Sequence, residues 1–161
     1  MFNFTKYITD LTQQNKKAQE HGFHPCSCSG MQELQGVINS LTDYTAFVCV
    51  NDVSSGETSM TGGGFSDRNS FVVFILKNYN PGDEKDRRIQ KNLCRNIMRQ
   101  MQSKLLYDYE EFAQQDVYFV LDSIMHNDIS DFVADGCTGV FFQVHIDEPI
   151  DLTYHAEEWN K

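Results

Sequence analysis

The sequence contains no catalytic or nucleotide-binding signature, so hypotheses about its function depend on architecture and charge. The glycines of Thr61–Phe65 could wrap an anion with their backbone amides, but no Gly-Lys-Ser or Gly-Lys-Thr follows them, and they lead into a predicted strand. A flexible hairpin, or an assembly loop that orders on contact, suits them better. We therefore expect no catalytic residue and no bound cofactor. A small enzyme without a recognisable motif stays open as an alternative.

Long apolar runs and a surplus of basic residues are missing as well. The first eleven residues are mildly amphipathic and lack the basic stretch and apolar segment of a signal peptide. The formal net charge is −10 and the pI is near 4.8. A globally acidic surface repels the phosphates of nucleic acid. These absences predict a cytoplasmic protein without a membrane partner, and they argue against nucleic acid as its main partner.

Cysteine is present, but not as a disulfide framework. The number of cysteines, five, is odd, and three of them lie within apolar runs or beside a glycine turn. Such residues behave as small buried hydrophobes with reduced thiols. The five are Cys26, Cys28, Cys49, Cys94 and Cys137.

The chain is long enough for one well-buried core. Its 161 residues are 40% hydrophobic, and neither an internal repeat nor a low-complexity tail interrupts them. We expect one domain, residues 1–161, with a helical N-terminal segment over residues 1–40 and an α+β core over residues 41–155.

Hydrophobic periodicity predicts the elements of that domain. Helices are expected over residues 3–20, 30–41 and 83–112, and strands over residues 45–50, 71–76, 117–124 and 139–146. Residues 51–70, rich in Ser, Thr and Gly, are expected to form a long loop. The order predicts an α+β fold with an antiparallel or mixed sheet of about four strands and helices on one face.

The longest predicted helix carries most of the positive charge. Between Lys85 and Lys104 the sequence has seven basic residues and one acidic residue, which leaves a net charge of −16 for the rest of the chain. Arg88, Lys91, Arg95 and Arg99 stack opposite the apolar side of this helix. The row is either a solvated helix face or a docking face for an acidic surface.

One short segment has the side chains that a metal ion prefers. His21, His24, Cys26 and Cys28 bring two imidazoles and two thiols within eight residues, and zinc favours both ligand types. The spacing differs from the Cys-x2-4-Cys pairs of structural zinc sites, so a chance cluster in a loop after the first helix is the competing interpretation. A stand-alone metal-binding protein is therefore a further alternative.

The order of elements resembles the tail-terminator and tail-completion proteins of tailed phages and prophage-like elements. The likeness covers about residues 40–155, and it includes the Asp135-Gly136 turn and the alternating run Gly139–Ile146. It implies ferredoxin-related subunits that close into a ring, cap a growing tail tube and face the head or neck. The first 40 residues remain outside the likeness.

The resemblance also implies partners and an interface. Residues 51–70 would order at the ring interface or lumen, and the basic row would meet an acidic neighbour. The partners would be protein subunits, in a homo-oligomeric ring or among the tail and neck proteins. The protein would be cytoplasmic during assembly and in the virion tail if it is phage-derived. The predicted interface residues are Arg88, Lys91, Arg95, Arg99, Gly62, Gly63, Gly64 and Phe65.

Overall fold

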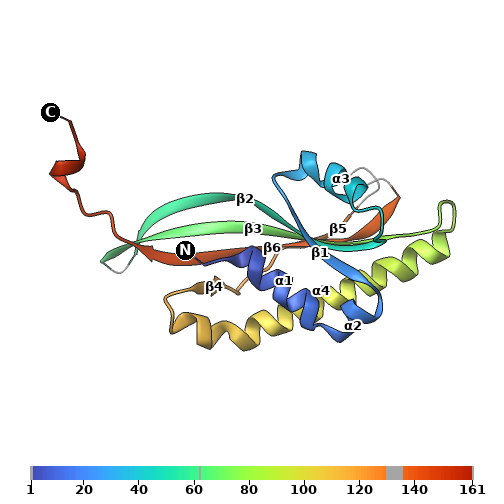
Figure 1. Ribbon diagram of the computed structural model, residues 1–161. Helices are drawn as coiled ribbons and strands as arrows, with labels where there is room; N and C mark the ends of the chain where they lie inside the picture. Colours follow the sequence, from blue (N-terminus) through green and yellow to red (C-terminus); the bar gives the residue numbers. More distant parts are fainter. Residues whose placement is uncertain (1, 62, 130–135, 161) are drawn as a thin grey trace.

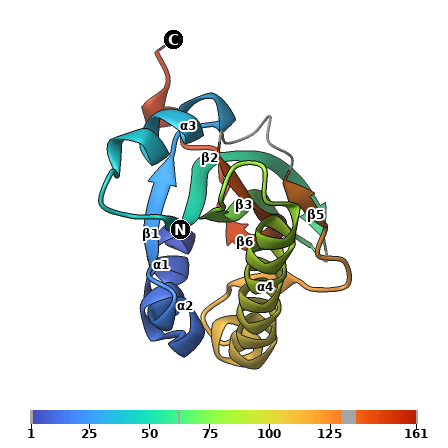
Figure 2. The same cartoon turned by 90° about the vertical axis from the view of Figure 1, so that its right-hand side faces the viewer.

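The computed structural model describes residues 2–61, 63–129 and 136–160, without the side chains of Val53, Ser54 and Thr61. In these ranges six strands form one mixed sheet, with helices on both of its faces (Figure 1, Figure 2). The strands are β1 (Phe23–Cys28), β2 (Ala46–Thr61), β3 (Gly64–Asn78), β4 (Tyr118–Val120), β5 (His126–Ile129) and β6 (Cys137–Ile150). Their order is β1-β2-β3-β6-β4, and β5 pairs with a separate stretch of β6. Only the β1–β2 pair is parallel among these pairings.

Side-chain caps mark where some of the helices begin. The helices are α1 (Phe4–Gln14), α2 (Lys16–Glu20), α3 (Met31–Ser40), α4 (Glu84–Ala113) and the short 3-10 helix η1 (Ala156–Glu158). The Asp83 carboxylate accepts from the backbone N–H groups at the start of α4. The Asn15 side chain accepts from the N–H of Ala18, so α2 starts at a new cap and the single helix expected over residues 3–20 is divided in two.

The expected four-stranded ferredoxin-like sheet, with helices on one face, is wrong. Sequence patterns missed β1 and β5, and α3 covers the face opposite α1, α2 and α4 (Figure 2). Pro25 lies within β1, where a proline is tolerated because β1 is an edge strand. β5 is short and mostly exposed, so its sequence shows no apolar alternation.

Residues 51–70 do not form the expected loop. β2 and β3 continue through them as a long antiparallel hairpin, paired as far as Thr61 and Gly64, with one irregularity between Asn51 and Ser55. The polar Ser, Thr and Asn side chains suit strands that are largely exposed, and they conceal the apolar signal that a half-buried strand would show. The predicted long loop is therefore strand on both sides of a tight turn.

Two apolar layers hold the helices to the sheet. Alternation along β2 sends Val48 and Val50 into a core with α1, α2 and α4, while Phe47 and Cys49 pack with α3 on the opposite face. The long helix expected over residues 83–112 is confirmed as α4, and its apolar row Ile97, Met101 and Leu105 is buried. None of the helices in the described ranges is long and apolar enough to cross a membrane.

A buried polar contact ties α1 to α4. The Tyr7 hydroxyl donates to the carboxylate of Asp108, 2.8 Å away, and Lys104 pairs with the same carboxylate. Burial and this hydrogen bond to a carboxylate raise the pKa of Tyr7. The phenol therefore stays protonated and keeps its role as a donor between the two helices.

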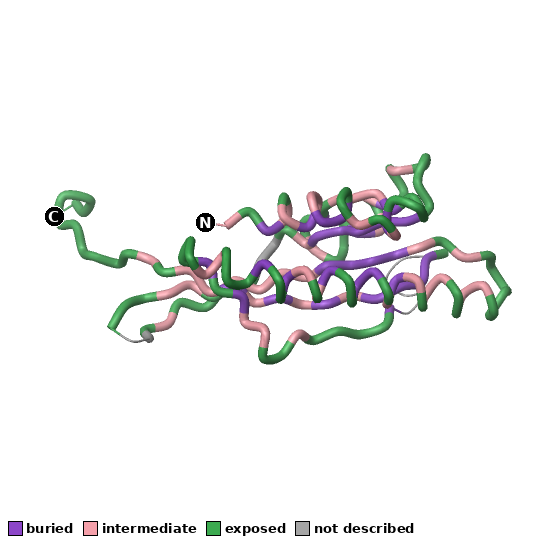
Figure 3. Tube along the Cα trace, turned by 90° about the horizontal axis from the view of Figure 1, so that it is seen from below, coloured by how far each residue is buried: buried purple, intermediate pink, exposed green. Residues whose placement is uncertain are grey.

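The sheet runs past its helical cover at one end (Figure 1, Figure 3). We call this end the arm and define it as residues 55–61 of β2, 64–70 of β3 and 145–150 of β6. Residues 151–160, which we call the tail, follow β6 and extend away from the body (Figure 1). The arm and tail together form one end of an elongated molecule.

Candidate functional site

The predicted basic docking face is partly neutralised within the chain. Arg95 and Lys91 on α4 both pair with Asp128 of β5, with Nη2–Oδ2 and Nζ–Oδ2 distances of 2.5 and 3.5 Å. Burial tends to raise the pKa of Asp128, but the two cations outweigh it and hold that pKa below its usual value. Arg88 and Arg99 are exposed and have no ion-pair partner among the described residues. The face therefore keeps two free cations.

A groove runs between α4 and β5 at this face. Its volume is about 460 Å³, within the range of protein ligand pockets. Arg95 and Arg99 form one wall, and residues 126–128 of β5 form the other. The side chains of Met98 and Val140, both almost fully buried, form its floor. The groove thus combines a small apolar base with a polar rim, on which Arg95 is paired with Asp128 and Arg99 is the cation without a carboxylate partner among the described residues.

The arm holds the second predicted interface. Phe65 is 41% exposed and pairs in register with Met60, which is 72% exposed, and with Ile150 on the other side. Gly63 and Gly64 lie at the turn, and Gly63 has φ +94°, a value that favours glycine. The predicted residue Gly62 lies outside the described residues, as does Asp135 of the predicted Asp135-Gly136 turn.

Sequence reasoning found Phe65 but missed the rest of this apolar stripe. Met60, Phe65 and Ile150 are cross-strand neighbours, so they share one face of the sheet. Along β3 that face continues through Phe71 to Val73 and Ile75, which pack under the helices. The stripe is thus the core face of the sheet where its cover has ended. Only the strand register could have revealed it.

The predicted metal ligands do not converge on a site. His21 caps the end of α2, where its carbonyl accepts from Lys77, and the His24 ring stacks on Tyr44 with centroids 3.8 Å apart. Within the described ranges, no group of three or more His, Cys, Asp and Glu side chains is arranged to hold a metal ion. The segment is strand β1 rather than the loop that we expected after the first helix.

Three cysteines nevertheless meet on the α3 side of the sheet. Cys26 and Cys28 lie two residues apart on β1 and share a face, and Cys49 of β2 stands opposite Cys26. Hydrogen bonding with Cys26 and Cys28 raises the pKa of the Cys49 thiol, and the hydrogen bond with Cys49 lowers the pKa of Cys28. All five cysteines are free thiols, as the sequence predicted.

A serine–histidine pair lies on the arm. Ser70 Oγ and His145 Nδ1 are 2.6 Å apart on paired residues of β3 and β6. A nucleophile of this type also needs a group that orients the imidazole through its other nitrogen. No residue in the described part of the chain bonds to Nε2 of His145. The contact is a cross-strand polar pair.

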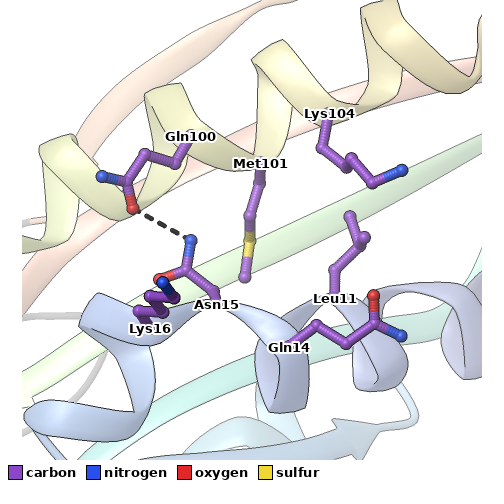
Figure 4. Close-up of a pocket in the computed structure, with 7 residues that line it drawn as sticks. All are labelled: Leu11, Gln14, Asn15, Lys16, Gln100, Met101 and Lys104. Carbon is purple, nitrogen blue, oxygen red and sulfur yellow. Dashed lines mark hydrogen bonds between the residues drawn. The ribbon is translucent and has the colours of Figure 1, made fainter.

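A further groove lies between α4 and the α1–α2 junction (Figure 4). Leu11 and Met101 meet across it, and the Asn15 amide donates to Gln100 Oε1 at 2.9 Å. Its volume is about 350 Å³. The remaining lining residues are Gln14, Lys16 and Lys104. The amide bridge ties the α1–α2 junction to α4 within one helical layer and partly closes the space.

The site on this chain is therefore two surfaces, a groove rimmed by cations and an apolar arm, at different places along the molecule. Neither known protein-family models nor curated protein sequences gave a match to the chain.

Proposed function

We propose that this protein is a structural subunit that assembles with further copies of itself. The observation that carries the proposal is the apolar stripe of Met60, Phe65 and Ile150 at the end of the arm. The same face of the sheet is buried wherever helices cover it. A neighbouring subunit that covered the stripe would complete the core.

The energetic gain of such cover is substantial. Full burial of a large apolar side chain contributes about 1.5–3 kcal/mol. Met60 and Phe65 are adjacent, so one partner surface could cover both. Contiguous apolar surface on a folded protein commonly marks an interaction site. The stripe therefore supports association more strongly than any other apolar feature of the arm.

Within this class, the resemblance to tail-terminator and tail-completion proteins supports a ring subunit of a phage-like tail or neck. The free cations Arg88 and Arg99 and the projecting hairpin agree with the roles that the resemblance implies for these segments. The partners would be copies of the chain and then the tail and neck proteins.

The oligomeric state of the purified chain tests the proposal. Native mass spectrometry and sedimentation velocity over a concentration series should show a closed oligomer, and negative-stain electron microscopy should show rings with a central opening. The double variant Met60→Ser/Phe65→Ser should lose the oligomer and keep the circular dichroism spectrum of the folded chain. Met31→Ser is the matched control, because Met31 is a comparably exposed methionine on α3.

A wild-type chain that stays monomeric at every accessible concentration would contradict self-assembly. An oligomer that persists in Met60→Ser/Phe65→Ser would show that the stripe does not carry the interface. Open filaments in place of rings would exclude the tail-terminator role while leaving self-assembly intact.

A further inference from the structure

The tail has the apolar and acidic side chains of a docking segment, but the interactions that the structure gives for it do not involve the rest of its own molecule. Its large side chains Leu152, Tyr154 and Trp159 are exposed, the last two by 71% and 65%. Tyr154 and Trp159 stack on each other with centroids 6.2 Å apart. The hydrogen bonds, ion pairs and ring contacts that the structure gives for residues 151–160 all stay within the tail.

The charge of the tail is opposite to that of the groove between α4 and β5. Residues 151–160 contain Asp151, Glu157 and Glu158 and neither lysine nor arginine. On the rim of the groove, Arg99 has no carboxylate partner among the described residues. Guanidinium groups pair with carboxylates and also stack on aromatic rings. The arginines of α4 can therefore bind both the acidic side chains and the aromatic rings of the tail.

The apolar parts of the two surfaces also correspond. The floor of the groove is made by Met98 and Val140, and a volume of about 460 Å³ has room for a large side chain. Thioether and aromatic groups make favourable contacts. Arg88 lies about 16 Å from Arg99 along α4, within reach of an extended ten-residue segment.

We infer that the tail of one copy binds in the groove between α4 and β5 of the next copy. This inference rests on the proposed self-assembly and adds a second contact between copies to that of the stripe. In the bound state, Tyr154 or Trp159 contacts the Met98 and Val140 floor, and the glutamates pair with Arg99 and Arg88.

The tail of a copy is directed away from its own body (Figure 1). Val140 lies in the groove, and Asp151 follows it eleven residues later, about 37 Å along β6. Trp159 is eight residues beyond Asp151, so it reaches back at most about 29 Å. Even a fully extended backbone falls short of Val140, so we assign the groove to the tail of a second molecule.

The resulting contact is head-to-tail. The tail projects from one end of the molecule (Figure 1), whereas the groove lies beside the middle of α4, so each copy offers a tail and a groove at different places. Contacts between two different surfaces build a ring if the rotation closes and a filament if it does not. A reciprocal exchange of tails between two copies would instead close into a two-fold dimer.

Two variants test the tail side and the groove side of the contact separately. Tyr154→Ala/Trp159→Ala removes the tail aromatics and keeps the groove, and Arg99→Glu reverses the rim and keeps the tail. Each should weaken self-association by roughly 30-fold, as expected for a central interface residue. Tyr107→Ala and Lys16→Glu are matched controls, because both residues are exposed and lie away from the groove and the tail.

The decisive measurement is native mass spectrometry of the two variants mixed in equal amounts. One molecule then has an intact tail and the other an intact groove, so the mixture should form one-to-one complexes at concentrations where either variant alone associates much less. If the wild type assembles and both variants assemble equally well, the tail inference is wrong and the proposed function stands. If the wild type remains a monomer, the proposed function itself fails.

Discussion

At Gly139, strand β6 passes so close to β3 that a side chain would not fit. A Cβ atom there would lie 2.0 Å from the carbonyl oxygen of Ile75 and 3.1 Å from the Cα of Leu76. Both are backbone atoms in the middle of the sheet, so relief would require the two strands to separate. We expect Gly139→Ala to lower the free energy of unfolding by about 3 kcal/mol, measured by urea denaturation.

Gly36→Ala is the control for that substitution. Gly36 lies inside α3 with no atom within 4 Å of an added Cβ, so alanine should raise the free energy of unfolding by about 0.5–1 kcal/mol. Equal effects at the two positions would mean that the close approach of β6 to β3 is not as the structure has it.

Native-state alkylation should separate the cysteines by burial. Cys26 is the only one with partial exposure among the five, so it should react first with iodoacetamide. Burial raises the pKa of Cys94 to about 12 and that of Cys137 to about 11. Both groups therefore stay protonated at neutral pH, and a protonated thiol reacts far more slowly than a thiolate. Mass spectrometry should show labelling of these two only after unfolding, and rapid native labelling of Cys94 would contradict the packing of α4.

The sequence predicted reduced cysteines, but it did not predict that three of them lie together on one face of the sheet. The odd number and apolar settings of the cysteines indicated free thiols. Strand alternation would have placed Cys26 and Cys28 on one face once β1 was recognised. The approach of Cys49 depends on the parallel register of β1 with β2, which no local pattern encodes.

Among the elements, β5 pairs with β6 through its backbone and is tied to α4 by one carboxylate. Asp128 holds β5 against α4 through Arg95 and Lys91. Asp128→Asn should cost less than about 1 kcal/mol at neutral pH, because the side chain is partly exposed and water screens the pairs. Asp43→Asn is the control, since Asp43 is exposed and has no partner among the described residues.

The effect of Asp128→Asn should depend on pH with a definite sign. The pKa of Asp128 is lowered in the folded chain, so the stability that the carboxylate contributes is present above the ordinary Asp pKa and is lost as the pH falls through the lowered value. The difference in unfolding free energy between wild type and variant should therefore shrink towards zero under acid. A difference that grew on acidification would contradict the ion pairs.

The sequence pattern predicted the long helix well and failed to predict the short strands. The 30-residue α4 has many turns over which its apolar row repeats, and its predicted bounds agree within two residues. β1 and β5 span six and four residues, and pairing with β2 and β6 defines them more than their own sequences. The basic row could be predicted because it lies on α4. The groove could not, because its other wall is β5, which the sequence pattern did not predict.

For the whole molecule, the arm should be the least protected part of the sheet. Residues 46–51 of β2 lie between β1 and β3, whereas residues 55–61 pair only with β3 among the described strands. Hydrogen–deuterium exchange of the dilute monomer should therefore be faster over residues 55–61, because few contacts oppose local opening there. Equal protection along β2 would mean that the arm is already covered, and slower exchange at high concentration would locate the partner.

The position of β6 has a consequence for synthesis of the chain. β6 fills the sheet between β3 and the short strands β4 and β5, yet roughly 60 residues separate it from β3 in the sequence. At about 5–20 residues per second, a ribosome needs roughly 3–12 seconds between completing β3 and beginning β6. During that interval β3 has an unpaired edge, because β6 has not yet been synthesised. We therefore expect the nascent protein to depend on chaperones or on slow, late pairing of β6 with β3.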